Sequence, residues 1–168
     1  MTKAKDIGMQ QKKIKPSEDL IFNDKVREQC RSCKRYGKKA TCPPYVEDVS
    51  YYSTLLTEYK YGTIYYEEFE RDENWEEKGK DSSLAINNVI ISERNSLFLN
   101  GHYFAVGFGA GSCKLCDTCA FPCRMPNKSL IPIEGTGMNI VEMMSKLGVK
   151  VEFPINDSFY RIGMLLYD

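Results

Sequence analysis

The sequence predicts an α/β protein, an α+β sandwich in which helices flank a central mixed sheet and two cysteine-rich loops leave it. Segments with the helical repeat alternate with short segments rich in β-forming residues, which is typical of helices packed on a sheet. A length of 168 residues suits one compact domain, and 42% hydrophobic with 27% charged residues is a globular mix. We therefore expect a single domain over residues 17–168, preceded by a basic, flexible tail at residues 1–16.

The first half of the chain predicts a helix, a strand and a second helix. Apolar residues of segment 49–59 fall at helical spacing behind an acidic pair that suits a helix N-terminus. Residues 63–69 are rich in aromatic and β-branched side chains and predict a strand. The second helix is expected to begin at a serine cap, Ser82 or Ser83, and to end at Gly101.

The second half of the chain predicts a buried strand, one further helix and two closing strands. Residues 102–108 indicate the buried strand, which leads directly into a cysteine-rich segment. Asn139, with Glu142 three residues later, resembles a capping box for a helix that ends at Gly148. Residues 149–153 and 159–167 predict the two closing strands, and residues 154–158 predict the turn between them.

The charge balance and hydropathy exclude several classes of protein. The chain carries 23 basic and 23 acidic residues, and zero net charge argues against nucleic acid or a membrane surface as partner. Its longest apolar stretch, residues 103–110, is far shorter than the ~20 residues of a membrane span. The basic N-terminus lacks an apolar signal region, so we expect a cytoplasmic protein. With His102 as the one histidine, Ser-His-Asp and histidine-zinc hydrolases are not expected.

Seven cysteines are gathered into two groups. An odd number of clustered thiols in a reducing compartment argues against a disulfide framework and indicates metal binding. The first group is Cys30, Cys33 and Cys42, and the second is Cys113, Cys116, Cys119 and Cys123.

The second group has the spacing C-x2-C-x2-C-x3-C, which is typical of the cluster loops of bacterial ferredoxins. Thiols at steps of three on a wrapped loop can reach several corners of one iron–sulfur cube. Zinc sites more often pair two C-x2-C knuckles from separate segments, so zinc is the less favoured alternative. The exit differs from ferredoxins, because Arg124 and not proline follows Cys123.

The total number of cysteines in the two groups is informative, because it can be compared with the number of ligands that a cluster needs. A [4Fe–4S] cluster takes four protein ligands, and seven cysteines are one short of two complete sets. Either a non-cysteine group completes a site, or one iron is open, or a single cluster is bound. His102 and Asp117 are the non-cysteine candidates, although a histidine satisfied by backbone and a solvated aspartate are the simpler interpretations.

Glycines and charged residues near the cysteines suggest how a cluster and its partner would be accommodated. Gly107, Gly109 and Gly111 predict close approach of backbone N–H groups to a cluster, with plain turn formation as the alternative. The acidic segment 67–77 is expected to be solvated, or else to dock a redox partner. The basic residues around the first group favour thiolate and metal binding, or else an anionic partner: Arg31, Lys34, Arg35, Lys38 and Lys39.

Together these motifs resemble a cysteine-rich family catalogued as domain of unknown function 2284. The resemblance covers residues 29–167 and depends on both cysteine groups, the Tyr36-Gly37 pair, Pro43-Pro44 and the stretch from Glu134 to Gly137. It implies a metal protein in which all seven cysteines are ligands, found largely in anaerobic microbes, and it implies no particular reaction.

The sequence therefore predicts an oxygen-sensitive protein with one or two [4Fe–4S] clusters that transfers electrons to a redox protein partner. Two alternatives stay open. One is an enzyme or metallo-accessory protein that uses an open cluster iron, and the other is a structural zinc-binding interaction module. Neither a membrane nor nucleic acid is expected as a partner.

Overall fold

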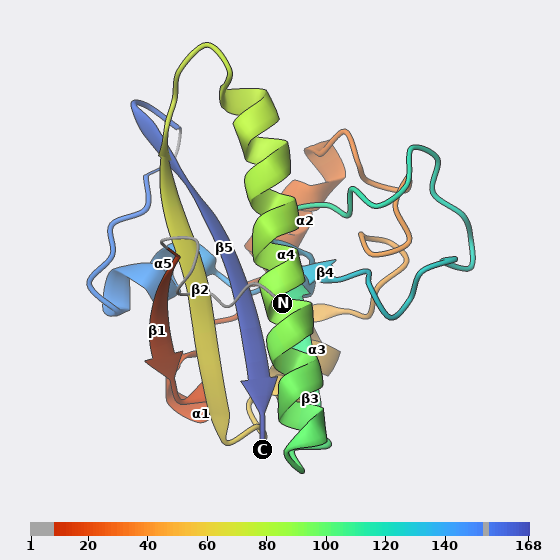
Figure 1. Cartoon of the computed structure of the whole chain (residues 1–168), viewed down its shortest axis with the longest axis vertical. Coiled ribbons are helices and arrows are strands. Elements are labelled where there is room, and N and C mark those ends of the chain that lie inside the picture. The colour runs from red at the N-terminus through yellow and green to blue at the C-terminus, as the bar shows by residue number, and fades with distance from the viewer. Residues whose placement is uncertain (1–8, 153–154) are drawn as a thin grey trace.

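A five-stranded mixed sheet organises the fold in a computed structural model that describes residues 9–152 and 155–168 (Figure 1). The strand order is β1-β2-β5-β3-β4, and all neighbours are antiparallel except the parallel pair β3 and β4. The predicted α+β class with a mixed central sheet is confirmed. The strands are β1 (Gln10–Ile14), β2 (Tyr61–Glu70), β3 (Ala105–Gly109), β4 (Ile131–Pro132) and β5 (Ser158–Tyr167).

Helices cover both faces of the sheet. The long helix α4 crosses one face, and the shorter helices lie against the other face or at the sheet ends (Figure 1). The described part of the chain has no helix with the length and apolar character of a membrane span. The helices are α1 (Pro16–Asp19), α2 (Asp24–Gln29), α3 (Val49–Leu56), α4 (Trp75–Leu99) and α5 (Ile140–Lys146), with 3-10 turns η2 (Cys30–Ser32) and η3 (Ile133–Thr136).

Alternation along the central strands divides the core into two layers. In β2, Ile64 and Tyr66 are buried in the layer formed with α3 and α5, whereas Tyr65 is buried in the layer formed with α4. In β5, Met164 and Leu165 divide in the same way. Successive side chains of a strand point to opposite faces of the sheet. Strands β2 and β5 therefore carry apolar side chains on both faces, one for each layer of the core.

Helix α4 approaches the sheet closely at three glycines. A Cβ atom at Gly107 of β3 would lie 2.4 Å from Cγ2 of Ile90, and one at Gly163 of β5 would lie 2.3 Å from Cδ1 of Ile90. A Cβ atom at Gly109 would lie 2.8 Å from Oδ1 of Asn87. The prediction that Gly107 and Gly109 admit a cluster is therefore wrong, because the space beside them is filled by α4.

Several predicted elements are confirmed with shifted ends. Helices α3 and α5 and strands β2 and β5 lie where the sequence placed them, and Asn139 caps α5 by accepting a hydrogen bond from the Glu142 N–H group at 3.3 Å. Helix α4 begins at Trp75, well before the predicted serine caps. Ser82 and Ser83 are instead buried inside the helix, with hydroxyls that donate to the Gly79 carbonyl.

Three predictions differ from the structure. Gln10–Ile14, expected in a flexible tail, pair with β2 as an edge strand, while residues 1–8 lie outside the described part. Strand β3 begins at Ala105, because the residues from 102 to 104 are not paired in the sheet. Residues 149–152 form no strand, and residues 153 and 154 of the predicted strand and turn lie outside the described residues.

Candidate metal centre

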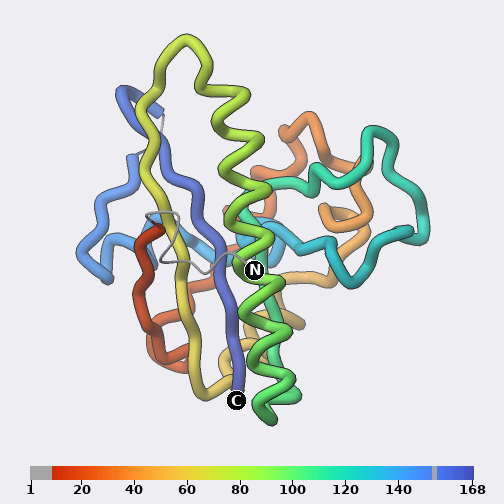
Figure 2. The backbone as a smooth tube through the Cα atoms, in the orientation of Figure 1, coloured from red at the N-terminus to blue at the C-terminus, as the bar shows by residue number. Residues whose placement is uncertain are grey.

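Two loops that are far apart in the sequence lie side by side beyond the β4 edge of the sheet (Figures 1 and 2). The first loop, residues 30–48, connects α2 with α3, and the second, residues 110–130, connects β3 with β4. Each loop carries one cysteine group. The folded chain therefore brings the two groups predicted from the sequence to one end of the molecule.

Three contacts join the loops. The Lys39 ammonium donates to the Cys116 carbonyl at 3.2 Å, and the Ala40 N–H group donates to the Cys119 sulfur at 3.3 Å. The rings of Tyr45 and Phe121 lie with centroids 4.5 Å apart. Each contact pairs one residue of the first loop with one of the second, so the loops form one unit.

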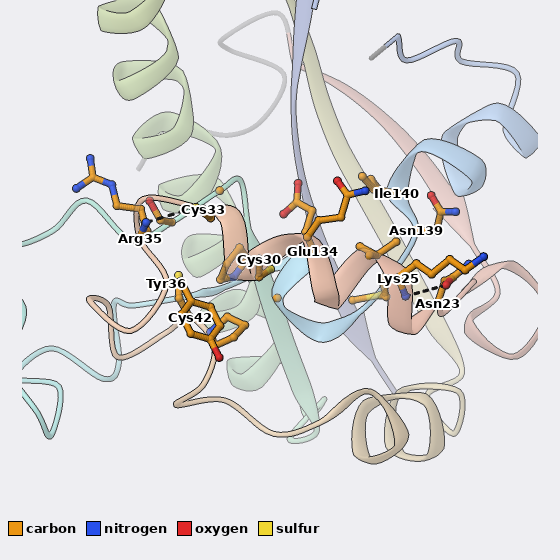
Figure 3. A pocket seen from close by; sticks show the side chains of 18 of the residues that line it. Asn23, Lys25, Cys30, Cys33, Arg35, Tyr36, Cys42, Glu134, Asn139 and Ile140 are labelled. Atoms are coloured by element: carbon orange, nitrogen blue, oxygen red, sulfur yellow. Dashed lines mark hydrogen bonds between the residues drawn. The ribbon is translucent and has the colours of Figure 1, made fainter. Parts of the chain in front are cut away.

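The cysteines divide between two cavities, which we call the open cavity and the closed cavity. The open cavity has a volume of about 590 Å³ and is lined by Cys30, Cys33 and Cys42 together with Glu134 of η3 (Figure 3). The closed cavity has a volume of about 10 Å³. Its lining contains all four cysteines of the second loop, Cys113, Cys116, Cys119 and Cys123.

Tight turns shape the first loop around its cysteines. The carbonyl groups of Cys30, Cys33 and Cys42 each accept a hydrogen bond at 3.0 Å from the N–H group three residues later. Gly37 has φ +68°, a left-handed conformation that glycine adopts without strain, and its N–H group donates to the Pro43 carbonyl at 3.0 Å. These turns keep the loop wrapped, so that its three thiols line one cavity.

All seven cysteines are free thiols, and backbone N–H groups are directed at three of their sulfur atoms. Besides the Ala40 contact with Cys119, the Arg35 N–H group donates to the Cys33 sulfur at 3.5 Å and the Met125 N–H group to the Cys123 sulfur at 3.4 Å. In metal sites, such hydrogen bonds stabilise the negative charge of sulfur ligands. The donor chemistry therefore suits a metal that prefers sulfur.

The environment of the first group opposes ionisation in the absence of a cation. Burial, with smaller contributions from the neighbouring Cys33, Cys30 and Cys113, raises the pKa of Cys42 to about 11. Burial also raises the pKa of Cys30, with a smaller contribution from the Glu134 carboxylate. A bound metal ion would offset these effects and displace the thiol protons.

The basic residues of the first loop have two different surroundings. Lys39 is only 8% exposed, and its ammonium is used in the contact between the loops. The other four are exposed at the surface of the loop: Arg31, Lys34, Arg35 and Lys38. The sequence treated all five alike, although only the exposed four are available to a partner.

The thiols are close but do not converge on one point. Within residues 9–152 and 155–168, no group of three or more His, Cys, Asp or Glu side chains could hold a metal ion in its present arrangement. The residues suit a thiophilic metal by their chemistry and by the cavities they share. Binding therefore requires the thiols of a cavity to draw together.

The two non-cysteine candidates from the sequence lie away from the open cavity, whose lining includes neither. His102 precedes β3 at the end remote from the second loop, where its Nδ1–H group donates to the backbone oxygen of Asp168 and its ring packs on Tyr167. The interpretation of a histidine satisfied by backbone is confirmed. Asp117 is exposed within the second loop.

The sequence reasoning missed Glu134 as a site residue. Its side chain is exposed at the open cavity, where desolvation by the surrounding protein atoms raises the pKa of its carboxyl group. The available signal was its position in the stretch from Glu134 to Gly137, which is part of the family resemblance. The spacing of the sequence does not link it to the cysteines of the first group, which lie more than 90 residues earlier.

Comparison with known proteins gives one match. The model of a family described as predicted metal-binding protein (DUF2284) matches residues 12–167, nearly the whole chain. No curated protein and no solved structure matches the chain.

Proposed function

Because this chain belongs to the DUF2284 family of predicted metal-binding proteins, we propose that its cysteine loops hold one or two [4Fe–4S] clusters and transfer electrons. The observation that carries the proposal is the closed cavity, which is lined by four cysteines with ferredoxin-like spacing. A bound cluster would supply one-electron chemistry there.

The residues around the cysteines have roles consistent with this function. The cysteines of each cavity would hold the cluster, and the N–H groups directed at their sulfur atoms would make reduction easier. The Lys39 ammonium, buried between the loops, would offset part of the negative charge of the thiolates. The surrounding protein would limit access of water to the closed cavity, whose volume is about 10 Å³.

We also propose a redox protein with an acidic surface as the partner. The exposed cations of the first loop lie next to the cysteines and would attract such a surface, shortening the path of the electron. The acidic residues between β2 and α4 follow the C-terminal end of β2 and line neither cysteine cavity. They are therefore the weaker docking face.

Anaerobic purification tests the function. We expect about four to eight iron atoms and equal acid-labile sulfide per chain, with a broad visible absorption that bleaches when dithionite is added. A colourless, iron-free protein from cells grown without oxygen and supplied with iron would overturn the proposal.

The volume of the closed cavity favours zinc as a second candidate. About 10 Å³ is on the order of the space for one water molecule, which suits a single ion better than a cluster. The protein would then be a structural interaction module. Stoichiometric zinc without acid-labile sulfide would identify it.

The open cavity favours a third candidate, an enzyme or metallo-accessory protein. Its volume of about 590 Å³ beside three thiols leaves room for a small molecule to bind an iron. A small ligand that shifts the electron paramagnetic resonance (EPR) spectrum of the reduced cluster would support this candidate, and complete thiolate ligation of every cluster would remove its basis.

A further inference from the structure

The two cavities divide the cysteines unequally, and this division identifies which site lacks a ligand. All four cysteines of the second loop line the closed cavity, so that site has a complete thiolate set. The open cavity has only three cysteines, and Glu134 is the carboxylate in its lining. We propose that the Glu134 carboxylate is the fourth protein ligand of the open-cavity site, beside Cys30, Cys33 and Cys42. This inference rests on the proposed function.

The turn that carries Glu134 is fixed in place beside Cys30. Ile133 anchors the turn in the core with 1% of its surface exposed, and the Thr136 hydroxyl donates to the Ile133 carbonyl at 2.6 Å. The Arg27 guanidinium donates to the Gly135 carbonyl at 2.7 Å and thereby joins this turn to α2, the helix that leads into Cys30. Figure 3 shows Glu134 beside Cys30 at the cavity.

Glu134 has a carboxylate available for a cation. Among the described residues it takes part in no salt bridge and accepts no hydrogen bond from another side chain. Arg161, a nearby cation, is engaged elsewhere, since its Nε–H group donates to the Gly79 carbonyl at 3.0 Å and its guanidinium lies over the Phe159 ring. Glu134 is exposed at the open cavity, so a metal ion held by the three thiols of that cavity could reach its carboxylate.

Carboxylate ligation gives this site a chemistry that the closed cavity lacks. Carboxylate oxygen is a harder ligand than thiolate and binds iron of a sulfur-rich cluster less strongly. Replacement of one thiolate by a less donating ligand raises the reduction potential of a cluster. The open-cavity cluster is therefore the more readily reduced and the more labile of the two.

The test compares anaerobically prepared wild-type protein with the variants E134A, E134C and E77A. Wild-type protein is expected to contain about eight iron atoms and to show two EPR signals after reduction. E134A should lose between one iron atom and a whole open-site cluster, while the closed-site signal persists. E134C should keep the wild-type iron content but show a lower potential for the open-site signal. E77A, the same substitution at an exposed glutamate of α4 that lines neither cavity, should match wild type.

The outcomes separate this inference from the proposed function. E134A with wild-type iron content, EPR spectrum and potentials overturns the Glu134 assignment and leaves the cluster proposal standing. If E134A does not fold, E134C decides, because an open-site signal identical to wild type would also overturn the assignment. Wild-type protein without iron and sulfide would overturn the proposed function itself.

Discussion

The open and closed cavities are both lined by cysteines but differ in volume and surroundings. The closed cavity is about 10 Å³ and is lined by four cysteines of the second loop, with Lys39, Ala40 and Thr41 of the first loop completing its wall. The open cavity is about 590 Å³, is formed between α2, the first loop and the turn at Glu134, and is lined by three cysteines. A compact site with only thiol ligands suits electron transfer, whereas a roomy site with an incomplete thiol set suits ligand exchange.

The difference follows from how each cavity is built. The four cysteines of the closed cavity lie within eleven consecutive residues of the second loop, and the Lys39 and Ala40 contacts hold the first loop against them. The open cavity depends on contacts between distant segments, such as the Arg27 hydrogen bond to Gly135. The closed cavity therefore takes all its cysteines from one loop, whereas the open cavity combines its cysteines with a turn that is far away in the sequence.

Loss of one cysteine from each cavity has the largest expected effect. C116S should remove about half of the bound iron and abolish one EPR signal, and C42S should remove the other half and the other signal. Iron analysis and EPR of anaerobic protein measure this. If either variant lost both signals while remaining folded, the two cavities would form one site and the comparison would fail.

Lys39 joins the two loops, so its loss should affect both cavities. K39M keeps the buried stem but leaves the Cys116 carbonyl without its charged donor, at a cost of about 2 kcal/mol. Urea unfolding of the metal-free protein measures this difference. K38M, at an exposed neighbouring position, is the matched control and should stay within about 0.5 kcal/mol of wild type. Equal stability of the two variants would contradict the role of Lys39.

Overpacking the sheet should affect stability and leave both cavities unchanged. G107A places a Cβ atom 2.4 Å from Ile90 Cγ2 and should cost about 2 kcal/mol, with wild-type metal content. Thermal unfolding and metal analysis test the two parts. The double variant G107A/I90A should lose less stability than the sum of the single variants, because I90A removes the clashing methyl group. Additive effects would show that the two residues do not compete for space.

The helix cap at Asn139 should give the smallest effect, limited to the wall of the open cavity. N139A removes the acceptor for the Glu142 N–H group and should cost about 1 kcal/mol in chemical unfolding. N139D keeps an acceptor and should stay close to wild type. The closed-site EPR signal should be unchanged in both variants, and its loss would show that the cavities are coupled through α5.

The fold was predictable where side-chain patterns are strong and not where buried residues are small. The apolar repeat of α3 and the β-forming run of β2 identify those elements. The first turns of α4 bury Gly79, Ser82 and Ser83, which give no apolar repeat, so its start was missed. Strand β1 buries only Ile14, so an alternating pattern is absent from its sequence.

The candidate site was predictable in composition and not in arrangement. Cysteine spacing identifies both groups, and the family match supports metal binding over residues 12–167. Spacing carries no information on which loop lies against which turn, because that depends on tertiary contacts. Glu134 was missed for this reason. His102 was considered because it lies close to Cys113 in the sequence, whereas in the fold it lies at the far end of β3, beside Asp168.

Anomalous diffraction at the iron edge, from crystals grown without oxygen, tests the central claim most directly. We expect two separate iron clusters, one among Cys113, Cys116, Cys119 and Cys123, and the other among Cys30, Cys33, Cys42 and Glu134. A single cluster shared between the loops, zinc in place of iron, or sulfur–sulfur bonds among these cysteines would contradict the account.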